Sequence, residues 1–211
     1  MNRKLGLTIF LFIALIGVSN VLAAEISVGV KKGDYIEYQV AFTGTPSAGH
    51  DVNWAMMEIK EVQGESVSVE LTSTHANGTQ EKFVANFNLQ TGQLGDDLII
   101  PANLDVGDVF FDQNVGNITI SGVEERTYAG AKRTVVHATT PETTYYWDKA
   151  TGILVEGEST FPDYTISTIA DKTNMWQPKL LGLDPTVFYA FVGATVVIVV
   201  ALAFLIAKRK K

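Results

Sequence analysis

Hydrophobic and polar residues alternate with a period of two along most of the chain between residues 34 and 169. Within Asp34–Gly44, Ile36, Tyr38 and Val40 fall on one face, whereas the residues between them fall on the other. Alternation of this kind predicts half-buried β-strands. It recurs, with turn residues in between, at 54–62, 67–71, 83–89, 109–111, 117–123, 126–128, 132–139, 143–147, 153–156 and 164–169.

Short turns such as Asn77-Gly78 and Asp148–Gly152 join these segments and favour antiparallel hairpins. One stretch, Gln90–Gln113, lacks the alternation and predicts a bent connection with a single short strand. No amphipathic helix is expected between the two ends of the chain. The predicted fold class is therefore all-β, an antiparallel meander that forms a sandwich or an open half-barrel, with an N-terminal signal helix and one C-terminal transmembrane helix.

The first residues have the pattern of a secretory signal peptide. Arg3 and Lys4 precede an apolar run over 5–18, and small residues follow at Ala23 and Ala24. A basic start, a short apolar stretch and a small-residue cleavage site are typical of such a peptide. We expect cleavage after Ala23, with Ala24 as the alternative, while an uncleaved N-terminal anchor remains open.

The last residues have the pattern of a membrane anchor. Val187–Ala207 is a run of 21 residues without a charge, and Lys208–Lys211 contributes four successive cations. About 20 apolar residues in a helix cover the hydrocarbon core, and the side rich in Lys and Arg stays in the cytoplasm. The sequence predicts a single-pass cell-membrane protein with its N-terminal domain outside and its C-terminus in the cytoplasm. No LPxTG-like sorting motif precedes the run, so the helix is expected to be retained.

These signals divide the chain into five parts. They are a signal peptide (1–23), an extracytoplasmic β-rich domain (24–170), a short stalk (171–186), the transmembrane helix (187–207) and a basic cytoplasmic stub (208–211).

Charge and cysteine content narrow the possible partners. Between residues 25 and 180 lie 22 of the 23 acidic residues but only 10 of the 16 basic ones. An outer domain with this excess of negative charge is repelled by nucleic acid, so no nucleic-acid partner is expected. The chain has no cysteine, which excludes disulfides, thiolate metal sites and cysteine nucleophiles.

Catalytic and metal-binding signatures are missing from the sequence. Neither a nucleophile elbow, a zincin motif nor a P-loop occurs, and His50, His75 and His137 lie far apart. Aspartates cluster at 96, 97, 105, 108 and 112, but their spacing fits no calcium-binding loop, and Asp is common in turns. The prediction is a non-enzymatic protein without a cofactor and without a metal site.

Aromatic residues are the most informative candidates for a site. A half-closed sheet can hold an apolar ligand against its concave face, and the tandem aromatics of 145–147 place rings on both faces of a strand. A packed core is the alternative explanation for the same residues. The predicted ligand-binding residues are Trp54, Phe83, Phe87, Tyr146 and Trp147.

Two sequons, at Asn77 and Asn117, are candidate glycosylation sites on the extracytoplasmic side. Asn77 lies in a predicted turn and is the better candidate.

Two segments, Gly130–Val135 and Tyr146–Glu156, resemble a pattern in the lipoprotein-carrier-like (LolA-like) superfamily, and Leu104–Asp108 is similar to a turn in such proteins. The chain also resembles archaeal and bacterial membrane-anchored surface proteins. The first resemblance implies antiparallel strands that cover a hydrophobic groove, and hence a lipid or other apolar ligand near the membrane. The superfamily's N-terminal helix and lipobox cysteine are missing, and no binding residue carries over.

Taken with the missing catalytic motifs, these features predict a membrane-anchored extracytoplasmic binding domain, with a lipid or other apolar ligand as the favoured choice. The alternative is a structural or adhesive cell-envelope protein that acts through contacts with an envelope protein partner.

Overall fold

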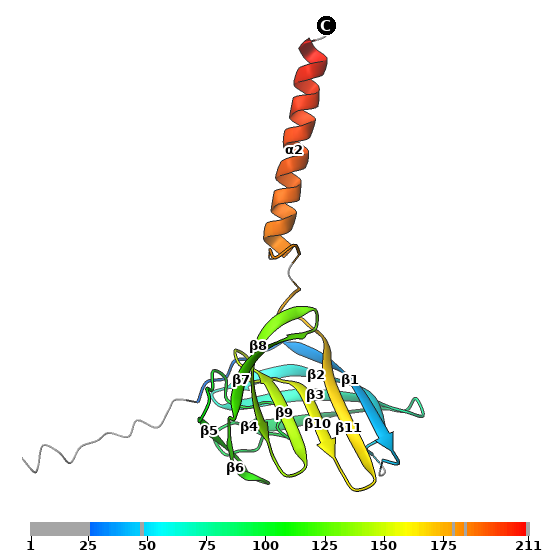
Figure 1. Ribbon diagram of the computed structural model, residues 1–211, viewed down its shortest axis with the longest axis vertical. Helices are drawn as coiled ribbons and strands as arrows, with labels where there is room; N and C mark the ends of the chain where they lie inside the picture. The colour runs from blue at the N-terminus through cyan, green and yellow to red at the C-terminus, as the bar shows by residue number, and fades with distance from the viewer. Residues whose placement is uncertain (1–25, 47–48, 179, 184, 210–211) are drawn as a thin grey trace, which may run out of the picture.

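The computed structural model describes residues 26–46, 49–178, 180–183 and 185–209, with the backbone alone from residue 201. The expected signal peptide lies outside these residues. The described part of the chain contains eleven β-strands and one long helix (Figure 1). The elements are β1 (Tyr35–Gly44), β2 (Val52–Gln63), β3 (Ser66–His75), β4 (Gln80–Asn88), β5 (Val109–Asp112), β6 (Gly116–Thr119), β7 (Gly122–Tyr128), β8 (Ala131–Thr139), β9 (Thr143–Asp148), β10 (Leu154–Thr160), β11 (Tyr164–Thr173) and α2 (Pro185–Arg209).

Nine of the strands form one open antiparallel sheet in the order β4-β3-β2-β1-β11-β10-β9-β8-β7. It consists of two meanders, β1–β4 and β7–β11, which are joined where the first strand pairs with the last. The prediction of an all-β antiparallel fold is confirmed. The described residues form one large sheet with free edges at β4 and β7, and the two stacked sheets of a sandwich are not observed.

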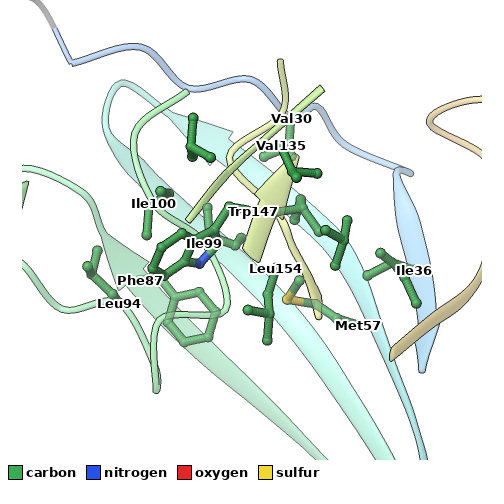
Figure 2. Close-up of a cluster of buried hydrophobic side chains, with 14 of the residues drawn as sticks. Val30, Ile36, Met57, Phe87, Leu94, Ile99, Ile100, Val135, Trp147 and Leu154 are labelled. Carbon is green, nitrogen blue, oxygen red and sulfur yellow. The ribbon is translucent and has the colours of Figure 1, made fainter. Parts of the chain in front are cut away.

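Alternation along the strands separates an inner face from an outer face. Ile36 on β1 lies opposite Met57 on β2, which in turn lies opposite Leu71 on β3. The first two side chains have no exposed surface. The core lies on this inner face, and Figure 2 shows that Ile36 and Met57 from the first meander share it with Trp147 and Leu154 from the second.

Residues 89–121, between β4 and β7, cover the inner face and are called the covering segment below. It carries the two-stranded β5–β6 hairpin and otherwise runs without regular structure. Its apolar side chains at Leu94, Ile99 and Ile100 are buried in the core. The predicted strand over 117–123 is divided at Ile120, because the backbone of this residue bonds Gly107 and Asp108 instead of a strand neighbour.

The chain after β11 turns back onto the domain. The Trp176 indole Nε1 donates a hydrogen bond to the Tyr128 carbonyl oxygen at 3.1 Å, and a Cβ on Gly130 would touch the ring of Pro178. The first part of the expected stalk therefore packs against the turn between β7 and β8. The division of the chain into five parts stays a prediction.

Helix α2 begins at Pro185 and continues to Arg209. Within the residues whose side chains the structure describes, no helix reaches the length and apolar character needed to cross a membrane.

Candidate functional site

The five predicted ligand-binding residues do not form one site. Trp147 and Phe87 are buried in the core, whereas Phe83 is 53% exposed on the edge strand β4. Trp54 and Tyr146 are half-buried and lie on the outer face. The sequence identified these residues as large aromatics. It could not show which face of the sheet each ring of residues 145–147 would take.

At β4, part of the inner face is not covered by the covering segment. Phe83 lies opposite Leu71 of β3, and Phe87 lies opposite Val67, so all four belong to inner-face rows. Phe87 is covered by the turn at Gly95, where a Cβ would overlap its ring, whereas Phe83 lies beyond the covering segment and stays exposed. A groove of about 330 Å³ also borders Val67 and Phe87, but most of its lining consists of polar outer-face residues of β2, β3 and β4, such as Glu61, Ser68 and Asn86, so it is not part of the inner-face surface at Phe83. We call Leu71, Phe83, Ala85, Phe87 and Leu94 the inner-face site.

Trp147 joins the sheet to the covering segment. Its indole Nε1 donates a hydrogen bond to the carbonyl oxygen of Asp97 at 2.6 Å. The ring stacks on Tyr145 at 5.2 Å and meets the edge of Phe110 at 5.6 Å, measured between ring centres. These rings, two from β9 and Phe110 from the covering segment itself, pack between the sheet and the segment, so a ligand could reach this depth only if the segment moved.

The turn that carries Asp97 is strained. Gly95, Asp96 and Asp97 have φ angles of 59°, 55° and 58°, a left-handed conformation that costs roughly 1–2 kcal/mol per residue with a side chain. The Asp97 side chain is buried, and its Oδ1 atom has no hydrogen-bond partner within the protein. Strain and an unpaired buried polar atom cluster at functional sites and at segments that move.

Burial raises the pKa of the Asp97 carboxyl to about 7, and the nearby charges of Asp112 and Asp96 add to this. A hydrogen bond from Tyr145 acts in the opposite direction. Asp112 is also buried, but its carboxylate accepts hydrogen bonds from the backbone N–H groups of Asn114 and Val115, both at 2.7 Å. The covering segment therefore buries two carboxyl groups with different environments.

The aspartate cluster gives no metal centre in the described residues, where no group of three His, Cys, Asp or Glu side chains could hold an ion. Asp105 instead bridges Lys149 at 2.6 Å, and Asp108 accepts the backbone N–H of Asp105. These contacts are those expected of aspartates in turns.

The three histidines have separate partners. His75 is buried and bonds Asp51 at 2.8 Å, while His50 contacts the Tyr164 hydroxyl at 2.6 Å. The Ser121 hydroxyl lies 3.1 Å from the His137 Nδ1 atom, but it also donates to the His137 carbonyl oxygen.

Sequence reasoning missed a polar cluster on the outer face. The Arg126 guanidinium lies 3.8 Å from the centre of the Tyr146 ring and bonds Glu156 at 3.0 Å. The Tyr128 hydroxyl donates to the same Glu156 carboxylate, and the His137 ring lies 5.4 Å from Tyr146. The cluster joins β7, β8, β9 and β10, so only knowledge of the strand order could have revealed it.

Both sequon asparagines are exposed, Asn77 in the turn between β3 and β4 and Asn117 on β6. Their glycosylation stays a prediction.

The comparisons with known proteins add little. No family model and no curated protein matches the chain. Among solved structures the chain is similar to the siderocalin Ex-FABP, which functions through dual ligand specificities. The identity is 13%, over 76% of this chain and 80% of that chain, with a TM-score of 0.25. At that TM-score the likeness decides neither fold nor function, and the similarity to the LolA-like superfamily stays a resemblance.

Proposed function

We propose that this protein is a membrane-anchored, extracytoplasmic, non-enzymatic binding protein whose ligand is a lipid or another apolar molecule. The observation that carries the proposal is the inner-face site, where Phe83 is 53% exposed on a surface that is otherwise core. A concave apolar surface with few polar groups is the usual form of a site for such ligands.

The covering segment supplies the means to enlarge this site. It meets the sheet through a bridge between Ile99 and Ile153, through the hydrogen bond from Trp147 to Asp97 and through a few further backbone bonds, and its turn at Asp96 and Asp97 is strained. Leu94, Ile99 and Ile100 occupy the inner face as an apolar ligand would. Displacement by a ligand would exchange one set of apolar contacts for another and would release the strain, which offsets part of the cost of the hydrogen bonds that break.

Two single variants test the site. Phe83→Ser removes the exposed inner-face ring, whereas Val84→Ser changes its neighbour, which is 60% exposed on the opposite face. Native mass spectrometry of the full-length protein should find an apolar adduct that Phe83→Ser reduces severalfold and Val84→Ser leaves in place. Equal adduct levels in the two variants would contradict the site.

A disulfide lock tests the covering segment. The backbone bonds from Ile100 to Gly152 and from Leu154 to Leu98 flank Ile99 and Ile153, which makes these two a non-hydrogen-bonded pair. Such pairs have Cα atoms about 4.5 Å apart, within disulfide range. The variant Ile99→Cys/Ile153→Cys should lose the adduct when oxidised and regain it when reduced. An adduct that survives oxidation would show that the segment need not move.

The anchor is a proposal supported by the sequence, where an uncharged run at 187–207 precedes four cations. The expected result is that the protein stays in the membrane fraction after extraction at alkaline pH. An external protease should degrade the domain while a tag after Lys211 is protected. The intact mass should show cleavage after Ala23. Release of the whole protein from the membrane fraction at alkaline pH would contradict the proposed membrane anchor.

A second candidate, adhesion to an envelope protein, is favoured by the β5–β6 hairpin. Val109, Phe111 and Val115 expose between 49% and 52% of their surface there. Exposed apolar side chains gathered in one place are typical of contact sites. Cross-linking through position 111 in intact cells should capture a protein if this candidate is correct, and only lipid or nothing if it is not.

A further inference from the structure

The domain has two ends of different charge. Antiparallel order places the start of β1, the end of β11 and the turns after β2, β7 and β9 at one end, called the proximal end. Contacts bear this out, because Asn174 donates to the Gly33 carbonyl oxygen at 2.8 Å and Gly29 packs on Ala150. The turns after β1, β3, β8 and β10 form the opposite, distal end.

Lysines gather at the proximal end. Lys31 and Lys32 lie exposed in the turn before β1, Lys132 follows the turn after β7, and Lys149 begins the turn after β9. The distal turns, at 45–51, 76–79, 140–142 and 161–163, contain no Lys or Arg in the sequence. They carry Asp51, Glu142 and Asp163 instead.

Some of the proximal charge is already balanced. Lys132 bridges Glu125 at 2.5 Å and Lys149 bridges Asp105 at 2.6 Å, so these two lysines attract a further anion weakly. Lys31 bonds Asp34 through its backbone, because its N–H donates to the Asp34 carboxylate at 2.9 Å and its carbonyl oxygen accepts from the Asp34 N–H at 3.1 Å, and the residue is exposed. Glu65 in the turn after β2 and Asp108 add negative charge at this end, so Lys31 and Lys32, which have no ion pair among the described residues, are the lysines expected to attract an anion there.

The chain leaves the domain at the proximal end. Pro178 lies against Gly130 in the turn after β7, and α2 begins at Pro185. The seven steps from Pro178 to Pro185 can extend over at most about 25 Å. The start of the helix is therefore tethered close to the proximal lysines and away from the distal acids.

We propose that the proximal end docks on the head groups of an anionic lipid bilayer, with Lys31 and Lys32 as its main contacts. The inference rests on the proposed membrane anchor. Each lysine near such a surface contributes attraction that weakens within a Debye length, and the acidic distal end is repelled, so the field orients the domain upright.

Energy transfer between the protein and the bilayer tests this orientation. The chain has no cysteine, so a single one can carry a dye at the proximal Ala150 or at the distal Glu142, both exposed. The labelled full-length protein is placed in nanodiscs of phosphatidylcholine alone, or with about 30% phosphatidylglycerol, that contain an acceptor lipid. The proximal dye should transfer more energy than the distal one, and the difference should grow with the anionic lipid.

Matched variants identify the lysines that orient the domain on the anionic bilayer. Lys31→Gln/Lys32→Gln and Lys60→Gln/Lys82→Gln remove equal charge, and the second pair lies on β2 and β4 beside Glu70. The first pair, or salt near 0.5 M, should abolish the gain from phosphatidylglycerol, while the second pair should keep it.

The possible failures are separable. Protein that enters the nanodiscs but shows equal transfer in both lipid compositions, or equal losses in both variant pairs, overturns the docking and leaves the anchor intact. Protein that fails to enter the nanodiscs at all overturns the anchor and the docking together.

Discussion

At the scale of single residues, Asp97 is the most unusual group in the domain. Burial raises the pKa of its carboxyl from 3.8 to about 7, so the folded protein prefers the neutral form. As pH rises from about 4 to about 7, the unfolded chain loses this proton first, and the free energy of unfolding therefore falls. The stabilisation that the protonated Asp97 carboxyl adds to the free energy of unfolding is fully present below pH 4 and is lost by about pH 7.

We therefore expect Asp97→Asn to be more stable than the parent at pH 8, by roughly 1–3 kcal/mol, and to show little advantage at pH 4. Urea unfolding at both pH values measures this. His75 has a raised pKa through its bond to Asp51 and also loses stabilisation as pH rises, but it is present in both proteins. Asp163→Asn, in an exposed turn, is the control, and an unchanged pH dependence in Asp97→Asn would show that Asp97 is hydrated.

The ion pair between Arg133 and Asp148 gives a second prediction at this scale. The guanidinium bonds both carboxylate oxygens, at 2.7 and 3.2 Å, and Asp148 has no exposed surface. Arg133→Met would leave this carboxylate buried without its partner, at a cost of about 3 kcal/mol in unfolding free energy. The same change at Arg126, whose partner Glu156 is 26% exposed, should cost less. Equal losses in the two variants would contradict the importance of burial.

At the scale of elements, the covering segment depends on close packing at two of its glycines, Gly92 against Phe111 and Gly95 against Phe87. Gly95 and Gly107 both have positive φ, at 59° and 89°, but only Gly95 lies against another residue, the buried ring of Phe87.

Gly95→Ala should therefore destabilise the domain by about 1–3 kcal/mol more than Gly107→Ala, because both variants incur backbone strain but only the first overpacks the core. Thermal unfolding measures the difference. Limited proteolysis should show faster cleavage within residues 89–121 in Gly95→Ala. Similar behaviour of the two alanine variants would mean that the segment is loosely packed.

Alternation predicted most strands, because an inner and an outer face leave a period-two signature in segments such as 34–44 and 132–139. Within the covering segment, residues 90–113 were marked as irregular with one short strand, as observed, whereas 117–121 was predicted to belong to a single strand that the structure divides. What the segment covers could not be predicted, since the burial of Leu94 and Ile99 depends on contacts with β4 and with Ile153, the residue before β10, that no local pattern encodes. The same limit explains why the sequence could not separate Phe87 from Phe83, which share a strand face and differ only in what lies above them.

At the scale of the whole molecule, the charged residues of the domain are distributed unevenly between its two ends. The sequence shows an acidic domain, but the division into a lysine-bearing proximal end and an acidic distal end appears only when the strand order is known. Residues 31 and 149 are far apart along the chain, and the fold brings their turns to the same end.

The pairing of β1 with β11 has a consequence for the order of folding. Lys172 and Glu37 bridge these strands 135 positions apart. A ribosome makes β1 early and β11 only just before the final helix, so each meander can form alone but the nine-stranded sheet cannot be completed until nearly all of the chain has been synthesised. During that interval the edge of β1 lies open, and partner strands from other chains or a holding chaperone would compete for it.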